Sequence, residues 1–400
     1  MQKIIVNVNK NETQIAIIED DKLVELYVEN PDEMIAGNIY TGIIKNKLKS
    51  MESFFVDIGQ QKKGFLVVEK DTKIKNKSGD TILVQVKKEE TDEKGAYLTQ
   101  DISINGKYMV LLPQAKEVMF SKKITSELKK NEVLELVNRI NTKKFGVIVR
   151  NDVLSIGIEE IEKEYISLVE KWDKIYSNFQ YMKPPKVVYK QDIEEFIFNN
   201  MVCKETIKVV INDEKVYTDL IKYSSIYDKK FGQKVELYED DRLDIFDMYK
   251  VNTQIEKALG SRVWLKSGAE LVFDKTEAMA VIDVDTSKFV GKKDKEQTIY
   301  KTNIEAAHEI ARQIRIRNIS GIIIVDFINM KDNKDKEEVL KILKEETGKD
   351  RIKTVILGIT KLGLVEITRQ KMRKSLDEIY KRDCPACKGK GQLRKRESSY

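Results

Sequence analysis

The chain has 400 residues, of which 41% are hydrophobic and 34% are charged, and its net charge is +6. One hydrophobic core seldom exceeds about 250–300 residues, so we expect a soluble protein with several folded units. No apolar run approaches the roughly 18 residues of a membrane span, and the N-terminus alternates like a strand rather than a signal peptide. Three cysteines cannot form a disulfide framework, which favours the cytoplasm. With a single histidine, His308, histidine-pair ribonuclease chemistry is excluded, and the expected packing or surface place of His308 on a helix argues against a Ser-His-Asp triad.

The predicted elements change character several times along the chain. Residues 1–30 read as three short strands joined by polar turns. From Gly37 to about residue 106, short alternating strands with glycine at the bends are typical of a small closed barrel. Residues 107–195 mix strands with amphipathic helices, and residues 196–258 alternate helix and strand. An α/β pattern then runs from about 259 to about 380, so the fold class is a multidomain α/β protein.

Three aspartates follow two apolar strands of this last region. In "AMAVIDVD", Asp283 and Asp285 share one face of a strand, while Ile282 and Val284 share the other. A helix with apolar residues at helical spacing comes next, and the β-branched strand "GIIIVD" ends at Asp326. A strand–helix–strand unit makes the two strands parallel and near neighbours. The aspartates are therefore expected at the sheet edge where open α/β folds carry their sites.

Each aspartate taken singly can be a helix cap or a turn residue. Three carboxylates at one edge would repel one another and raise their pKa values, and a hard divalent cation relieves that conflict. Oxygen ligands favour magnesium or manganese over zinc. The class of enzyme best supported by these residues is a metal-assisted hydrolase. His308 lies one helical turn from Ile304 and is expected to be a packing or surface residue.

The stretch "CPACKGKG" supplies two cysteines, Cys384 and Cys387, of the four ligands that a structural zinc requires. Neither Cys203 nor His308 is an obvious completing ligand, whereas a twofold axis would bring the same pair from a second chain. A solvent-exposed redox pair is the alternative. The segment from Arg369 to Arg396 contains eleven Lys and Arg residues and only three acidic residues. Such a composition is typical of a solvated tail or of a nucleic-acid contact.

These motifs resemble the bacterial ribonuclease E/G endoribonucleases. Four stretches are similar to the family's "IDVNS", "TNLEAADEIARQ", "VIDFIDM" and "CPRCSGTG", in the same order and spacing: "IDVDTS", "TNIEAAHEIARQ", "IVDFINM" and "CPACKGKG". The similarity covers essentially the whole chain. It implies an RNase H-like subdomain split by two insertions, a DNase I-like catalytic subdomain and a zinc link. The implied parts are RNase H-like 1–34 and 196–258, OB-fold RNA-binding barrel 35–106, 5′-end sensor 107–195, catalytic 259–380, zinc link 381–393 and basic tail 394–400.

The resemblance also assigns the family's site residues to individual positions of this sequence. Asp283 and Asp326 match the aspartates that hold catalytic magnesium in the family. Asp285 stands where the family has an asparagine, so an amide donor has become a group that only accepts hydrogen bonds or ligates. Asn329 likewise replaces the family's usual second aspartate of that motif.

Two further sets of residues match the family's RNA contacts. Phe55 and Phe65 fall on RNA-stacking positions and Lys94 on a basic contact. The alternation of Phe55 with Phe54 and Val56 favours an exposed face for Phe55, and barrel core is the alternative for the two phenylalanines. Arg150 matches an arginine that binds phosphate in the family. Its guanidinium can bind two oxygens of a terminal monophosphate at once. Asn151 takes a position that is usually serine or threonine.

The resemblance implies a magnesium-dependent endoribonuclease, with manganese as an alternative metal, that acts in rRNA and mRNA processing and decay. It would cut single-stranded, A/U-rich RNA and leave a 5′-phosphate and a 3′-hydroxyl. Family members share one zinc between two subunits, which implies a homodimer linked through Cys384 and Cys387. The family usually continues into a small domain that helps to assemble tetramers, so a dimer is expected here. The rival interpretations are a noncatalytic RNA-binding protein that uses the barrel and basic tail, and a DNA nuclease with the same carboxylates.

Overall fold

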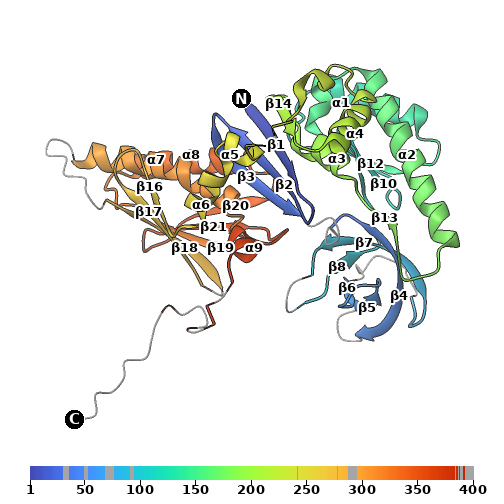
Figure 1. Cartoon of the computed structure of the whole chain (residues 1–400), viewed down its shortest axis with the longest axis horizontal. Coiled ribbons are helices and arrows are strands. Elements are labelled where there is room, and N and C mark those ends of the chain that lie inside the picture. Colours follow the sequence, from blue (N-terminus) through green and yellow to red (C-terminus); the bar gives the residue numbers. More distant parts are fainter. Residues whose placement is uncertain are drawn as a thin grey trace, which may run out of the picture. The chain divides into compact units, whose positions relative to one another are not determined.

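The computed structural model describes residues 1–29, 36–48, 53–67, 76–90, 94–240, 242–276, 278–286, 295–382, 384–385, 387 and 391. The chain forms two compact units. Unit 1 comprises Met1–Asp20 and Glu29–Ile245, and unit 2 comprises Asp21–Val28 and Phe246–Tyr400 (Figure 1). Among the described residues, no helix combines the length and the apolar character that crossing a membrane requires.

The first sheet of unit 1 joins strands that are far apart in the sequence. β1 pairs antiparallel with β2 and parallel with β14, and β15 adds parallel to β14. The apolar N-terminal strands thus gain partners from about 200 residues downstream, next to helix α4. These elements are β1 Gln2–Val8, β2 Thr13–Glu19, β14 Thr206–Ile211, α4 Glu214–Ser225 and β15 Val235–Leu237.

The second sheet of unit 1 is a closed barrel, as the sequence predicts. Five strands follow one another in the order β4-β5-β6-β8-β7, and β7 returns to pair with β4. Its interior is filled by apolar side chains, and Gly64 has no room for a side chain because a Cβ would lie 2.4 Å from Leu98. The strands are β4 Ile39–Leu48, β5 Ser53–Asp57, β6 Gly64–Val67, β7 Thr81–Lys88 and β8 Tyr97–Thr99.

A third sheet, of strand order β11-β12-β10-β9, completes unit 1. Helices α1 and α2 bury their apolar stripes in the same core. Strand β13 leaves this region and pairs with β4 of the barrel. The elements are β9 Ile104–Asn105, β10 Met109–Leu112, β11 Val118–Phe120, α1 Glu127–Ile140, β12 Gly146–Val149, η1 Asn151–Ser155, α2 Ile158–Tyr181, β13 Lys186–Tyr189, α3 Ile193–Phe196, η2 Ile197–Met201 and η3 Phe231–Lys234.

Unit 2 is built on a six-stranded sheet of order β16-β17-β18-β19-β21-β20. Strands β18 and β19 are parallel and joined through helix α7, which confirms the predicted strand–helix–strand unit. The other neighbouring pairs are antiparallel. The strands are β16 Arg262–Trp264, β17 Glu270–Lys275, β18 Met279–Asp285, β19 Gly321–Asp326, β20 Thr354–Ile359 and β21 Val365–Arg369.

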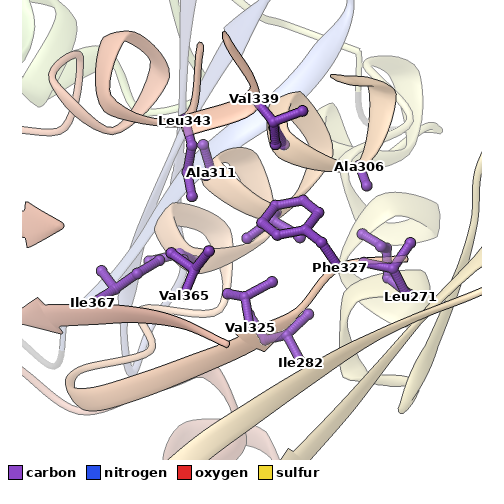
Figure 2. Close-up of a cluster of buried hydrophobic side chains, with 14 of the residues drawn as sticks. Leu271, Ile282, Ala306, Ala311, Val325, Phe327, Val339, Leu343, Val365 and Ile367 are labelled. Carbon is purple, nitrogen blue, oxygen red and sulfur yellow. The ribbon is translucent and has the colours of Figure 1, made fainter. Parts of the chain in front are cut away.

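Helices α7 and α8 cover one face of this sheet, with Ala306, Ala311, Val339 and Leu343 against the strands (Figure 2). The alternation of β18 explains the arrangement, because every second side chain is buried in that core and the others are exposed or half-buried on the opposite face. The helices of unit 2 are α5 Ile245–Met248, α6 Val251–Leu259, α7 Lys295–Ile316, α8 Asn333–Thr347 and α9 Leu376–Tyr380; β3 Lys22–Glu29 contributes its first seven residues to this unit.

Candidate functional site

Two of the predicted carboxylates lie side by side in unit 2. Asp283 is the direct partner of Asp326 in the parallel pair of β18 and β19, whose backbones are about 4.8 Å apart. Both side chains are exposed on the sheet face opposite α7 and α8. Asp285 lies on the same face, one step further along β18, where it faces Glu270 of β17.

The electrostatics of this edge favour a cation. Partial burial raises the pKa of Asp283, and the negative charges of Asp326 and Asp285 raise that pKa further. Among the described residues, no group of three or more His, Cys, Asp or Glu side chains is close enough to hold one metal ion. The structure thus provides a carboxylate pair. One or two carboxylates, completed by water and substrate phosphate, are how magnesium is commonly bound in proteins, so the pair fits that ion.

Two contacts from α7 fix the loops beside the pair, and the sequence interpretation missed both. The buried Asn303 side chain donates to the Ile328 carbonyl (2.7 Å) and accepts from the Ile328 N–H (3.1 Å), which holds the segment after Asp326. Glu305 accepts from the N–H groups of Lys266 and Ser267 at 2.6 and 3.1 Å, which fastens the β16–β17 turn. The only sequence signal was a polar pair, "TN", on a helix that otherwise packs through apolar residues.

His308 has a surface role, as predicted. Its side chain is half exposed, and Nδ1 lies 3.2 Å from a Glu346 carboxylate oxygen on α8. The one histidine of the chain therefore links the outer sides of two helices and does not belong to the carboxylate pair.

The barrel carries a row of aromatic rings on its outer surface. Phe55 and Phe65 are direct partners on β5 and β6, with ring centroids 5.8 Å apart, and both are half-buried. Their neighbours in the strands, Phe54 and Leu66 among them, fill the barrel interior, so the alternative that Phe55 and Phe65 form the core is wrong. Tyr97 of β8, which the sequence interpretation missed, is in register with Phe65 at 6.4 Å between centroids.

Charged side chains border this aromatic row. Lys88 of β7 is the register partner of Tyr97 and is exposed. Lys94 is exposed as well, shortly before Ala96, whose carbonyl accepts from the Phe65 N–H at 2.7 Å. Aromatic faces beside cations are what a single-stranded nucleic acid requires from a binding surface.

Arg150 follows β12 and is anchored inside unit 1. Its guanidinium donates to the Asn199 carbonyl and to Asn105 Oδ1, both at 3.1 Å. Asn151, which begins η1, is exposed. These bonds fix the orientation of the guanidinium and involve only two of its five N–H donors.

The strand beside Arg150 is held by a buried carboxylate. Glu164 of α2 accepts from the N–H groups of Lys107, Tyr108 and Met109 at 2.5, 2.8 and 2.9 Å. Burial raises the pKa of Glu164 to about 7, because loss of solvation outweighs the stabilisation of the charged form by these bonds and by Arg150.

Of the two C-terminal cysteines, Cys387 accepts a hydrogen bond from the backbone. The Gly391 N–H donates to the Cys387 sulfur at 3.3 Å, and Gly391 has a φ of +63°, which favours glycine. Cys384 is exposed, whereas Cys203 belongs to unit 1 and its thiol donates to Gln2 at 3.3 Å. Three more residues of "CPACKGKG", Lys388, Gly389 and Lys390, and the predicted basic tail 394–400 lie outside the described residues.

The carboxylate pair on the sheet of unit 2 and the aromatic row on the barrel of unit 1 are thus the two candidate sites of the chain. The family model described as "Ribonuclease E/G family" matches residues 103–372. Ribonuclease G of Escherichia coli (strain K12) is 33% identical over 98% of this chain and 84% of its own length. Ribonuclease G of Haemophilus influenzae is 34% identical over the same shares, and ribonuclease E of Synechocystis is 31% identical over 98% of this chain and 60% of its own length. The chain belongs to the ribonuclease E/G family and is an endoribonuclease of RNA processing.

Proposed function

We propose that the enzyme is magnesium-dependent, with manganese as a possible substitute, and that it hydrolyses single-stranded, A/U-rich RNA at Asp283 and Asp326. The products would carry a 5′-phosphate and a 3′-hydroxyl. The observation that supports this most directly is the register of Asp283 with Asp326 on an exposed sheet face. Magnesium held there would neutralise the charge that develops on the phosphate and would activate water.

The chain's own residues position the reacting groups. Asn303 and Glu305 hold the two loops that flank the pair, so the carboxylates stand on rigid elements. Asp285 adds negative charge beside the pair and would strengthen its attraction for a cation without itself ligating it.

RNA would be held on the barrel by Phe55, Phe65 and Lys94, with Tyr97 extending the stacking surface. Arg150 and Asn151 would bind a 5′-terminal phosphate, since the bonds to Asn199 and Asn105 orient the guanidinium in advance. Arg150→Ala is then expected to reduce the preference for 5′-monophosphate over 5′-hydroxyl RNA. An unchanged ratio of kcat/KM for the two substrates would remove Arg150 from the sensor.

The domain assignment follows the same proposal. Residues 1–34 and 196–258 would form the RNase H-like subdomain, 35–106 the OB-fold barrel, 107–195 the 5′-end sensor and 259–380 the DNase I-like catalytic subdomain. The parallel pairing of β1 with β14 supports the first of these, because it joins the two separate stretches in one sheet.

Cys384 and Cys387 would share one zinc with the same pair of a second chain, giving a cytoplasmic homodimer. The turn at Gly391, whose N–H reaches the Cys387 sulfur, supports a thiolate ligand because such a bond stabilises sulfur charge. Metal analysis with light scattering tests this, and we expect one zinc per two chains. One zinc per chain, or a zinc-free dimer unchanged by Cys384→Ser, would refute the shared site.

The deciding experiment is incubation with a 5′-labelled A/U-rich oligoribonucleotide and its DNA counterpart, with magnesium or with EDTA. We expect cleavage of RNA alone, only with the metal, and fragments that carry a 3′-hydroxyl. RNA binding without cleavage would favour the noncatalytic RNA-binding alternative, and cleavage of DNA would favour the DNA nuclease.

A further inference from the structure

The face of the sheet that carries Asp283 and Asp326 also carries an exposed tryptophan. Trp264 ends β16 and is 58% exposed, an unusual position for the largest apolar side chain. The only other tryptophan, Trp172, is 7% exposed in the core of unit 1. Unlike Trp172, Trp264 can therefore meet a ligand.

The pairing of strands places Trp264 in line with the carboxylates. Trp264 is the register partner of Glu270, which is the register partner of Asp285. Register partners point to the same side of a sheet. The indole therefore lies on the face of the carboxylates, two strands from β18, or about 10 Å at the usual strand spacing.

A second row of the sheet runs beside the first and begins with an arginine. Arg262 is the register partner of Val272, Val272 of Asp283, and Asp283 of Asp326. Arg262 Nη1 lies 2.5 Å from Glu270 Oε1, and the Arg262 side chain is 61% exposed. Because Glu270 itself is buried, this ion pair holds the guanidinium on the open face, with further N–H donors directed to solvent.

The tryptophan and the arginine are held in place by the rest of unit 2. Glu305 fastens the turn that follows Trp264 to α7, and the Glu270 carboxylate fixes Arg262. An aromatic face next to a guanidinium, both preorganised on strands, matches the base and the phosphate of one nucleotide.

We propose that Trp264 and Arg262 form a nucleotide subsite of the RNA-cleaving site, in which the indole stacks on a base and the guanidinium binds the adjoining phosphate. This subsite rests on the proposed role of Asp283 and Asp326, since it receives a nucleotide near the bond that is cut. It sets where the substrate is positioned along the sheet, and it accepts any base because every base presents a π-face.

Tryptophan emission tests the contact without any need for cleavage. In the Asp283→Asn variant, saturation with an A/U-rich oligoribonucleotide should quench the emission of Trp264, and adding Trp264→Phe should remove that change. Anisotropy of labelled RNA confirms that the site is filled. RNA bound at saturation with unaltered Trp264 emission overturns the proposal.

Cleavage kinetics locate the nucleotide. Trp264→Ala should raise KM about tenfold, the effect of one stacked base, while Trp264→Phe keeps most of the affinity. A substrate series with a single abasic nucleotide at successive positions should lose affinity at one position in the wild type and show no further loss there in Trp264→Ala. Equal abasic losses in both proteins at every position would refute the subsite.

Two controls distinguish base stacking from a general effect of losing an exposed ring and from a contact between chains. Tyr181→Ala removes an aromatic ring that is 85% exposed on α2 and should leave KM unchanged. A fall in dimer mass for Trp264→Ala, with KM and abasic losses unaltered, would assign the indole to a contact between chains and overturn the proposal. If Asp283→Asn still cleaves at the wild-type rate, the catalytic assignment fails, whereas the emission result still decides whether Trp264 meets RNA.

Discussion

Unit 2 holds two carboxylates, Glu25 and Asp283, whose pKa values are displaced in opposite directions. Burial alone would raise the pKa of Glu25, but Arg351 and Arg315 outweigh it and lower that pKa to about 2. Each guanidinium reaches a Glu25 oxygen at 2.7 Å. Asp283, by contrast, has a raised pKa, and the charged groups that raise it are other aspartates.

The charge of Glu25 is balanced within the protein, whereas the charge of Asp283 is left for a ligand to balance. A carboxylate that is neutralised by the protein's own arginines has no capacity left for a metal ion. Carboxylates placed together on an exposed face destabilise one another until a cation arrives. We therefore expect Glu25 to determine stability and the exposed aspartates to determine activity, and substitutions can separate these two effects.

The largest effect is expected at the carboxylate pair. Asp283→Asn or Asp326→Asn removes a ligand charge at constant volume, and cleavage should fall on the order of a thousandfold or more, since several kcal/mol of charge stabilisation is lost. Thermal melting should be unchanged or slightly raised, because repulsion between the pair is relieved. Asp274→Asn, exposed on the same face two residues from Val272, is the matched control and should keep its rate. A near wild-type rate in either variant would make the assignment wrong.

Glu25→Gln, in contrast, should lower the stability of the fold. Leaving the buried Arg315 guanidinium and the partly exposed Arg351 guanidinium without their counter-charge should lower the free energy of unfolding of unit 2 by about 3–5 kcal/mol, which urea melts measure. The folded-state pKa of about 2 lies below the ordinary glutamate pKa of 4.5, so this stabilisation is present above pH 4.5 and is lost as the pH falls towards 2.

The control and the pH profile make that prediction specific. Glu296→Gln breaks an ion pair with Lys331 in which both side chains are mostly exposed, and it should leave the melt unchanged. If wild type and Glu25→Gln lose stability in parallel between pH 4.5 and 2, the Glu25 network does not carry the acid sensitivity.

Much of the sheet edge that carries the carboxylate pair could be predicted, because the sequence patterns that define it are local. The alternation of β18, the helical spacing of α7 and the apolar run of β19 each lie within a few residues, and the parallel pairing rule joins them. That reasoning places Asp283 and Asp326 at the same sheet edge on neighbouring strands, and the structure adds that the two are register partners. It could not find the contact of Glu25 with Arg315 and Arg351, because those residues are about 290 and 326 positions away and meet only through tertiary packing.

In the barrel, too, local patterns could be predicted and long-range pairing could not. Alternation predicted Phe55 on the outer face, but not Tyr97, whose place beside Phe65 depends on the parallel pairing of β6 with β8. Register between strands far apart in sequence is set by how the barrel closes. Asn303 and Glu305 were missed for a similar reason, since their partners are backbone groups of distant loops.

An intermediate effect is expected on the barrel. Phe55→Ala with Phe65→Ala should weaken single-strand binding by at least about tenfold, since each stacked base contributes roughly 1–3 kcal/mol. The melt should change little, because both rings lie on the outer face. Leu66→Ala, which is buried in the barrel core, should instead cost roughly 2–5 kcal/mol and serves as the comparison. Binding measured by anisotropy beside a thermal melt decides, and large destabilisation in the double variant would return the rings to a structural role.

The smallest effect is expected at Asp285. It shares a face with Asp283, yet its register partner is Glu270 and not Asp326, and no group of three acidic side chains among the described residues can hold one ion. Asp285→Asn should therefore leave the magnesium requirement unchanged. It also removes one of the charges that raise the pKa of Asp283, so the acidic limb of the rate profile should move slightly to lower pH. Cleavage titrated with magnesium at several pH values measures both. A large rise in the magnesium concentration at half-maximal rate would make Asp285 a third ligand, and the exposed group would then bind metal through three carboxylates rather than a pair.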